Sequence, residues 1–131
     1  MYFSVRVVSR TPFEYNQLED GTYEFTKFNN TGYIKELTID YALEIQYDEN
    51  NNDPNTNFTL VKDETKPITE IHEYAFNGDG TLETVYIGAS VTSIDGKSFY
   101  SCWSLKEFVV DENNPNYCDV DGVLYNKDKT Q

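Results

Sequence analysis

Basic residues, cysteine and histidine are scarce in this chain, and each shortage argues against a class of function. Ten Lys and Arg stand against 23 Asp and Glu, which gives a net charge of −13. Binding of nucleic acid needs clustered cations, so we expect no nucleic-acid partner, and anionic membranes are disfavoured for the same reason. The two cysteines and the single histidine show no metal-ligand spacing, so we expect no bound metal.

Long apolar runs and glycine-rich loops are also missing. The mean hydropathy is −0.64, and no run approaches the ~20 apolar residues that a membrane-spanning helix requires. The start, Met1–Arg6, lacks the basic and apolar regions of a signal peptide. No glycine-rich phosphate loop is present, since Gly78–Gly80 is better interpreted as a turn before a strand at Leu82. We therefore expect no membrane insertion and no cofactor, and the length of 131 residues favours a single domain.

The sequence does contain a tandem repeat. The stretch from Ile68 to Ile87 recurs from Val91 to Val110, an offset of 91 − 68 = 23 positions. Such a short period predicts a stacked solenoid, because one unit cannot bury its own apolar side. Most of the matches are apolar, which favours a buried ladder beneath a solvated exterior. The identical pairs are Thr69/Thr92, Ile71/Ile94, Phe76/Phe99 and Leu82/Leu105.

The repeat resembles a known family. Each copy has the form L-x-x-[VF]-x-[IV], then a turn, then [IV]-T-x-I, then a phenylalanine. This pattern is similar to the BspA-like branch of the leucine-rich repeat family, firmly over Pro67–Val110 and more loosely over Val120–Thr130. Gly88 stands where that family usually has proline, and Asp95 where it usually has glycine. The resemblance implies a β-rich, right-handed leucine-rich-repeat solenoid with short strands, and with loops or single helical turns on its convex side.

Upstream, Ile34–Ile39 carries the same spacing and suggests a degenerate copy, 82 − 34 = 48 positions before Leu82, which is near two periods. Aromatic and polar residues alternate over Gly21–Phe28, and Asn29–Gly32 supplies a turn. We therefore predict that Thr22–Ile39 forms a β-hairpin that caps the solenoid. Phe3–Val7 is a further candidate strand. We thus expect a capping region at 1–66 with the degenerate copy and an acidic insert, two clear repeats at 67–110, and a C-terminal hairpin at 111–131 with further repeats missing beyond it.

Residues that alternate along a strand face opposite sides of a sheet, which divides the repeats into two faces. The complementary, outward set should line the concave face, where a tyrosine and a valine among carboxylates suit a partner's basic or aromatic groups. The alternative is that these side chains only solvate the sheet. The apolar set that should point inward is Ile34, Leu37, Ile39, Leu82, Val85, Ile87, Leu105, Phe108 and Val110. The candidate partner-binding residues are Glu36, Thr38, Thr84, Tyr86, Glu107 and Val109.

Trp103 and Cys102 lie side by side in the loop before Leu105, and each has two candidate roles. An exposed Trp103 would anchor a partner, whereas packing against Phe99 would place it in the convex core, and we favour the core. Cys102 stands where the BspA-like pattern often carries a small buried cysteine, so we interpret it as a compact hydrophobe. A disulfide to Cys118 is the alternative, and it would require the C-terminal hairpin to fold back on the second repeat.

Two oxygen-rich segments are candidates for calcium loops. Asp48–Asn55 carries several carboxylates and amides, but its composition favours a mobile surface loop. Asp119–Gly122 resembles the start of a calcium loop, yet Thr130 occupies the place of the required glutamate. We instead predict that its Asp-Gly pair forms the turn between strands at Tyr117–Val120 and Val123–Tyr125.

Catalysis has little support in the sequence. No recognisable motif ties the single histidine, His72, to Cys102 or to any serine, so we interpret it as an exposed polar residue and expect no enzyme. The family resemblance implies a non-catalytic protein-binding module of a bacterial cell-surface or secreted protein, such as an adhesin for a host or extracellular-matrix protein. The alternative is a structural spacer or capping domain that displays another domain of a larger protein.

Overall fold

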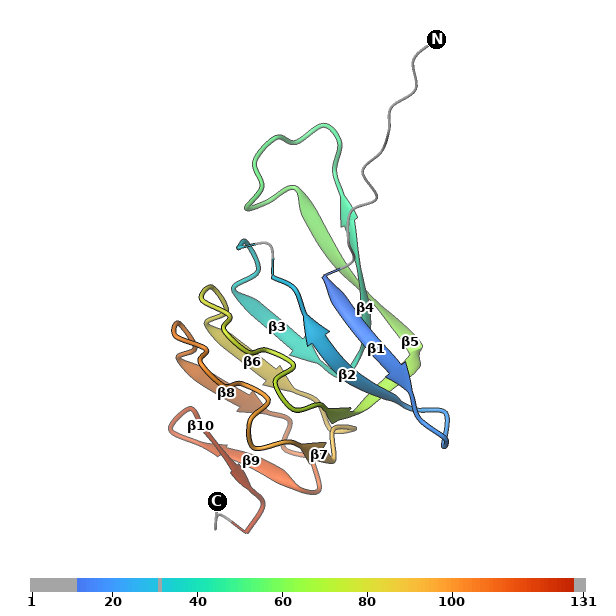
Figure 1. Cartoon of the computed structure of the whole chain (residues 1–131), viewed down its shortest axis with the longest axis vertical. Coiled ribbons are helices and arrows are strands. Elements are labelled where there is room, and N and C mark those ends of the chain that lie inside the picture. The colour runs from blue at the N-terminus through green and yellow to red at the C-terminus, as the bar shows by residue number, and fades with distance from the viewer. Residues whose placement is uncertain (1–11, 31, 129–131) are drawn as a thin grey trace.

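The structure, a computed structural model, describes residues 12–30 and 32–128, so the candidate strand Phe3–Val7 lies outside the described residues. The described residues form ten β-strands and no helix, and loops and turns connect the strands (Figure 1). The strands are β1 (Phe13–Gln17), β2 (Tyr23–Phe28), β3 (Glu36–Ile39), β4 (Tyr41–Tyr47), β5 (Phe58–Ile71), β6 (Thr84–Ile87), β7 (Ser93–Ile94), β8 (Glu107–Val110), β9 (Tyr117–Val120) and β10 (Val123–Asn126).

Three of the strands form a parallel sheet in the order β3-β6-β8. Leu37, Val85 and Phe108 lie in register across it. Leu37 and Val85 are buried, with at most 1% of their surface exposed, and Phe108 on the outer strand is half-buried. Alternation therefore sends one side of each strand into the core, as the hydrophobic pattern requires. The predicted inward ladder is confirmed at these positions, and Glu36–Ile39 within the proposed degenerate copy lies in register with β6.

The prediction that two periods separate β3 from β6 is wrong, because these strands are direct neighbours. The extra length is a hairpin arm, formed by β4 and the first part of β5. At the base of this arm, Tyr41 is paired with Pro67 in the strand register. The arm spans 67 − 41 + 1 = 27 residues. Removing it reduces the 48-position offset to 48 − 27 = 21, which is close to the 23-residue period. The arm is thus an insertion within one repeat.

A second row of parallel pairings completes each repeat. The end of β5 pairs with β2 on one side and with β7 on the other, so Phe25, Ile71 and Ile94 lie in register. Phenylalanine rings fill the core: Phe76 stacks on Phe25 with the ring centroids 4.9 Å apart, and on Phe99 with the centroids 4.6 Å apart. Aromatic side chains in offset contact add to the free energy gained from burial alone. The repeat is held by this series of rings as well as by the aliphatic ladder.

The predicted hairpin at Thr22–Ile39 is wrong. Its first half, β2, pairs with β1 and β5, whereas its second half, β3, pairs with β6. Phe25 and Phe28 both contact the ring of Phe76, so burying them in the core requires β2 to lie against β5 rather than fold back on β3. The hairpin that does form joins β1 to β2, and its turn is closed by a hydrogen bond of 2.8 Å from the Leu18 amide to the Thr22 carbonyl.

The acidic insert is the tip of the arm. Asp48 and Asp53 each accept a hydrogen bond from the backbone amide two residues further on, which is the Asx-turn geometry of short polar side chains. At the base of the arm, the Leu43 amide donates to the hydroxyl oxygen of Tyr15 at 2.8 Å. Burial raises the pKa of Tyr15 well above its ordinary value of 10.0, although this hydrogen bond acts in the opposite direction. The arm is therefore anchored to β1 at one end and exposed at the other.

The C-terminal hairpin forms as predicted, with β9 and β10 joined at Asp121-Gly122. The two turn residues have φ values of 52° and 81°, as a type I′ turn requires. This hairpin also covers the outer edge of β8. The Phe108 amide donates to the Gly122 carbonyl at 2.8 Å, and the Val110 amide donates to the Asp119 carboxylate at 2.8 Å. The backbone donors of this edge are therefore satisfied within the chain.

Gly88 departs from the family's proline for a structural reason. Its amide donates to the Ile39 carbonyl at 2.9 Å, and proline has no amide hydrogen. A Cβ at this position would lie 2.6 Å from the Cβ of Asp40 and 3.2 Å from the Ile39 carbonyl oxygen. The backbone after β6 passes close to the backbone after β3, where the arm begins. Only glycine fits such an approach.

Candidate functional site

The six candidate partner-binding residues lie on the outer side of the β3-β6-β8 sheet, which we call the open face. They form two rows that run across the strands, one of Glu36, Thr84 and Glu107 and one of Thr38, Tyr86 and Val109. All six are exposed or half-buried, and the residues between them point inward. The sequence therefore placed these side chains on one face correctly. Their role in binding stays a prediction.

A cavity of about 370 Å³ lies between the open face and the arm, and we call it the recess. The open face contributes only part of its wall, so three candidate residues line the recess and the other three lie on the exposed remainder of the face. Asp40 joins the two walls. The sheet supplies Glu36, Thr38 and Tyr86, and the arm supplies Leu43, Leu60 and Lys62.

The residues of the arm were missed by the sequence interpretation, although they carry a signal. Leu43 pairs with Lys62 and Ile45 pairs with Leu60, so these four side chains share one side of the arm. Three of the four are aliphatic, and the residues between them are Glu44 on β4 and Val61 on β5. The alternation on β4 is that of a strand with one apolar side. It indicates an amphipathic hairpin with its apolar side turned toward the open face.

Charges in the recess are only partly paired. Lys62 Nζ lies 3.6 Å from the Asp40 carboxylate and 5.3 Å from the centroid of the Tyr41 ring. Within residues 12–30 and 32–128, neither Glu36 nor Glu107 forms an ion pair, so both carboxylates remain available on the open face. The open face and the recess together therefore carry an excess of negative charge.

The prediction that Trp103 packs in the core is wrong, since 77% of its surface is exposed. The core position belongs to Cys102, whose Sγ donates to the Phe76 carbonyl at 3.2 Å. Neighbouring residues of this loop cannot both point inward, and the smaller side chain occupies the interior. A shift of 23 positions aligns Trp103 with the exposed Gly80 and aligns Cys102 with the buried Asp79, so the two copies share one burial pattern that the residue types alone do not reveal.

Both cysteines are free, so the alternative of a Cys102–Cys118 disulfide is wrong. Burial, and secondly the nearby negative charge of Asp79, raises the pKa of the Cys102 thiol to about 11. Thiolates are the reactive form of cysteine, so this thiol is poorly reactive at neutral pH. Cys118 Sγ lies 3.5 Å from the Asn126 carbonyl in the C-terminal hairpin.

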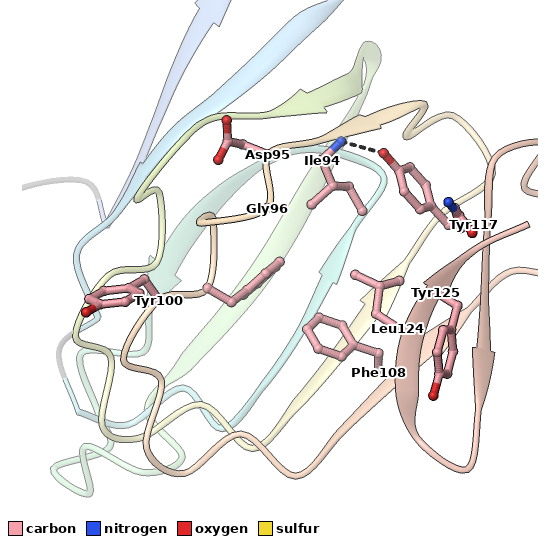
Figure 2. Close-up of a pocket in the computed structure, with 10 residues that line it drawn as sticks. Ile94, Asp95, Gly96, Tyr100, Phe108, Tyr117, Leu124 and Tyr125 are labelled. Atoms are coloured by element: carbon pink, nitrogen blue, oxygen red, sulfur yellow. Dashed lines mark hydrogen bonds between the residues drawn. The ribbon is translucent and has the colours of Figure 1, made fainter. Parts of the chain in front are cut away.

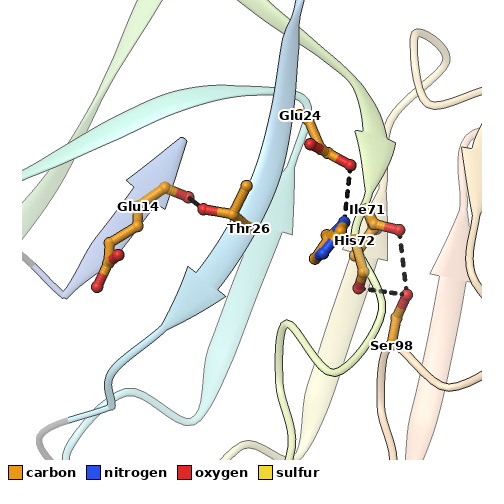
Figure 3. A network of polar contacts seen from close by, with 6 residues as sticks. All are labelled: Glu14, Glu24, Thr26, Ile71, His72 and Ser98. Carbon is orange, nitrogen blue, oxygen red and sulfur yellow. Dashed lines mark hydrogen bonds and ion pairs between the residues drawn. The ribbon is translucent and has the colours of Figure 1, made fainter. Parts of the chain in front are cut away.

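His72 belongs to a structural network (Figure 3). Its Nδ1 lies 2.9 Å from the carboxylate of Glu24 on β2, and its side chain is about half exposed. The hydroxyl of Ser98 donates to the backbone carbonyls of Ile71 and His72, at 3.2 Å and 3.0 Å, and not to the imidazole. The serine and the histidine therefore do not form a nucleophile–base pair. The contacts fasten β2 and the loop after β7 to the end of β5.

A second cavity, of about 690 Å³, lies at the C-terminal end of the ring series (Figure 2). Its floor includes Phe99 and Phe108, and the side chains of Tyr117, Leu124 and Tyr125 border it from the C-terminal hairpin. The Ile94 amide donates to the hydroxyl of Tyr117 at 2.8 Å and ties the hairpin to β7. None of the six candidate residues lines this cavity.

The described residues also bear on metal binding and on membrane insertion. Residues 12–30 and 32–128 contain no group of three or more His, Cys, Asp or Glu side chains that could hold a metal ion. A search of the same residues finds no helix with the length and hydropathy needed to cross a membrane.

Comparison with known proteins gives one match. A family model described as a BspA-type leucine-rich repeat region of six copies matches residues 24–119. This range runs from β2 into β9 and covers most of the chain, including the degenerate copy and the arm. No curated protein and no solved structure matches. Proteins of this family are usually surface modules for protein interaction, and leucine-rich-repeat domains are generally non-catalytic. The chain belongs to the BspA-type leucine-rich repeat family.

Proposed function

We propose that this chain is a non-catalytic protein-binding module of a bacterial cell-surface or secreted protein, and that it binds a host or extracellular-matrix protein through the open face. The observation that carries the proposal is that two rows of side chains lie in register across β3, β6 and β8. They present six side chains on a rigid sheet, beside a second wall supplied by the arm. Binding residues act best on a scaffold that holds them in place before the partner arrives.

The chemistry of the open face suits a protein partner. Val109 is 37% exposed and neighbours the half-buried Tyr86, which gives an apolar centre. Glu36 and Glu107 flank this centre in the adjacent row and supply polar contacts at its margin. An apolar centre with a polar margin is the usual anatomy of a protein interface, and tyrosine is enriched among its dominant residues.

We further propose how the fold is organised. The repeats form a right-handed solenoid, in which residues 1–66 act as an N-terminal cap with the degenerate copy and the arm, 67–110 carry the two clear repeats, and 111–131 form the C-terminal hairpin. Support comes from the β1–β2 hairpin, which adds an antiparallel strand beside the first parallel pairing. A terminal repeat needs an atypical outer side because nothing stacks beyond it.

The test measures binding to immobilised extracellular-matrix proteins by surface plasmon resonance. Tyr86→Ala removes the central ring of the open face and Glu107→Lys reverses a charge beside it, so each should weaken binding about tenfold or more. The matched controls are Tyr100→Ala and Glu112→Lys, which make the same changes at exposed positions outside the face, and they should keep full affinity. Retained binding in both open-face variants contradicts the proposal. A wild-type chain that binds none of the proteins supports the structural-spacer alternative instead.

A further inference from the structure

We propose that the recess between the arm and the open face receives an arginine side chain of the protein partner. This inference rests on the proposed function, because it names the group that the partner presents. It also assigns a task to the arm, which is an insertion relative to the 23-residue repeat.

The walls of the recess match the two ends of a long basic side chain. Leu43 and Leu60 from the arm and the ring of Tyr86 from β6 offer apolar surface. Glu36 and Asp40 add carboxylates to the same cavity. Arginine and lysine bury their methylene stems along apolar surface and keep the charged head beside polar groups. An anionic or a wholly apolar occupant would leave the carboxylate of Glu36 without a partner, which is costly as water is excluded.

The recess already accommodates one cationic group from the chain itself. Lys62 places its ammonium group 3.6 Å from the Asp40 carboxylate while 48% of its side chain stays exposed. This contact satisfies Asp40 but leaves Glu36 without an ion pair among the described residues. The negative charge left in the recess therefore lies on the open-face wall, and the net charge of −13 favours the approach of a basic partner.

The geometry favours arginine over lysine. Glu36 and Tyr86 are diagonal neighbours on β3 and β6, since Glu36 is paired with Thr84, two positions before Tyr86. A planar guanidinium group stacks on an aromatic ring and donates two parallel hydrogen bonds to a carboxylate, so it engages both residues at once. A lysine ammonium group is a compact point charge that lacks the planar fork.

The experiment titrates the isotope-labelled protein with N-acetyl-arginine amide and follows backbone amide signals by NMR. The expected result is saturable shifts for Glu36–Asp40, Leu43, Leu60–Lys62 and Tyr86, with little change elsewhere. N-acetyl-citrulline amide is the matched probe, because its side chain has nearly the same shape without the charge, and it should bind about tenfold more weakly. Equal binding of the two probes, or shifts spread over the whole surface, overturns the proposal.

Two variants locate the site. Glu36→Gln removes the unpaired carboxylate of the recess with little change in volume, and the affinity for the arginine probe should fall about fivefold to tenfold. Glu112→Gln makes the same charge change at an exposed position outside both the open face and the recess, and should leave the affinity unchanged. Equal losses in the two variants indicate general attraction to a negative surface and contradict a specific site. The NMR spectrum of each variant also shows whether the fold is intact.

Failure of this inference is distinguishable from failure of the proposed function. If Tyr86→Ala and Glu107→Lys abolish binding of a matrix protein but the arginine probe produces no saturable shifts, the open face is the binding surface and the arginine inference is wrong. If the probe shifts the recess signals as expected but no matrix protein binds, the inference stands and the choice of partner in the proposed function is wrong.

Discussion

At the scale of single residues, one loop position keeps the same backbone conformation in both clear copies of the repeat. Gly78 and Ser101 are 23 positions apart, and both have left-handed backbone, with φ of 77° and 60°. Glycine adopts this conformation without steric cost, whereas an L-residue with a side chain does not. Ser101 sits between the exposed Tyr100 and the inward-pointing Cys102, so its conformation helps to send one side chain out and the other in. Strain at Ser101 is the cost of this arrangement in the second repeat.

Replacing Ser101 with glycine should relieve that strain. We expect Ser101→Gly to raise the free energy of unfolding by about 0.5–1 kcal/mol, less than the full penalty for left-handed backbone because glycine also gains freedom in the unfolded chain. Urea denaturation measures the change. Ser101→Ala is the control, since alanine keeps a Cβ and should bring no gain. A less stable glycine variant would show that the serine side chain contributes more than its backbone costs.

The Cys102 thiol makes stability depend on pH in the alkaline range. Its pKa rises from an ordinary 9.0 to about 11 on folding, so the unfolded chain releases this proton first as the pH increases. The free energy of unfolding should therefore be unaffected by this group below about pH 9 and should fall between about pH 9 and 11. Tyr15, whose pKa is also raised from 10.0, acts in the same direction above pH 10.

Thermal denaturation at a series of pH values tests this dependence. We expect Cys102→Ala to reduce the slope of stability against pH between about pH 9 and 11, whatever its effect at pH 7. Comparing slopes rather than absolute stabilities separates the titration from the loss of packing. An unchanged slope would mean that Cys102 ionises as easily in the folded protein as in the unfolded chain.

At the scale of elements, the repeat correctly predicted the features that its period specifies directly, namely which strand positions point inward. The 23-residue period identified the inward positions of β6 and β8, because burial selects apolar residues at fixed spacing. It did not identify the partner of β2, since alternation in Tyr23–Phe28 fits a local hairpin and a distant parallel neighbour equally well. Parallel pairing leaves no turn signal in the sequence, so contacts with β5 and Phe76 decide it.

The candidate site likewise has one part that the sequence predicted and one part that it did not. The six open-face residues followed from alternation alone, whereas the recess depends on an arm that folds over them. The strands of the arm carry period-two patterns, but the direction in which a hairpin leans is set by tertiary contacts. Here those include the hydrogen bond between Leu43 and Tyr15. Sequence patterns therefore identified the wall formed by the repeat and not the wall formed by the insertion.

The junction between the arm and the sheet depends on Gly88. An added methyl group would lie 2.6 Å from the Cβ of Asp40, with the Ile39 carbonyl oxygen 3.2 Å away, so the backbone would have to move. We expect Gly88→Ala to lower the free energy of unfolding by about 1–3 kcal/mol. Gly96→Ala is the matched control, because no atom lies within 4 Å of its added Cβ and its backbone is not left-handed. The control should be neutral or slightly stabilising, and equal losses in both variants would contradict the contact argument.

At the scale of the whole molecule, charge opposes the compact state. The net charge is −13, and four ion pairs are found within residues 12–30 and 32–128. Most are exposed pairs that contribute little to stability, so repulsion among the acidic side chains is weakly compensated. The packed ring series and the two rows of parallel strands must overcome this repulsion. The same excess charge is one reason for our proposal that the open face binds a basic partner.

Salt should therefore stabilise the protein. We expect the melting temperature to rise by about 2–5 °C when NaCl is increased from ~10 mM to ~150 mM, because ions screen the repulsion. Calorimetry at fixed pH measures the shift. A double variant, Glu49→Lys and Glu112→Lys, changes two exposed positions and brings the net charge from −13 to −9, so its gain from salt should be smaller. A melting temperature that falls with salt would show that the ion pairs outweigh the repulsion.

The arm also sets an order in which the chain can fold. Val85 and Phe108 meet after closure of a loop of 23 positions, whereas Leu37 must reach Val85 across 48. Closing the longer loop costs more chain entropy unless the arm has already formed, which reduces the separation to 21. The hairpin of the arm needs only local contacts, so it can form early and hold the two ends of the arm close together. An arm that forms first would bring β3 and β6 together, so that the two walls of the recess would be assembled in the same folding event.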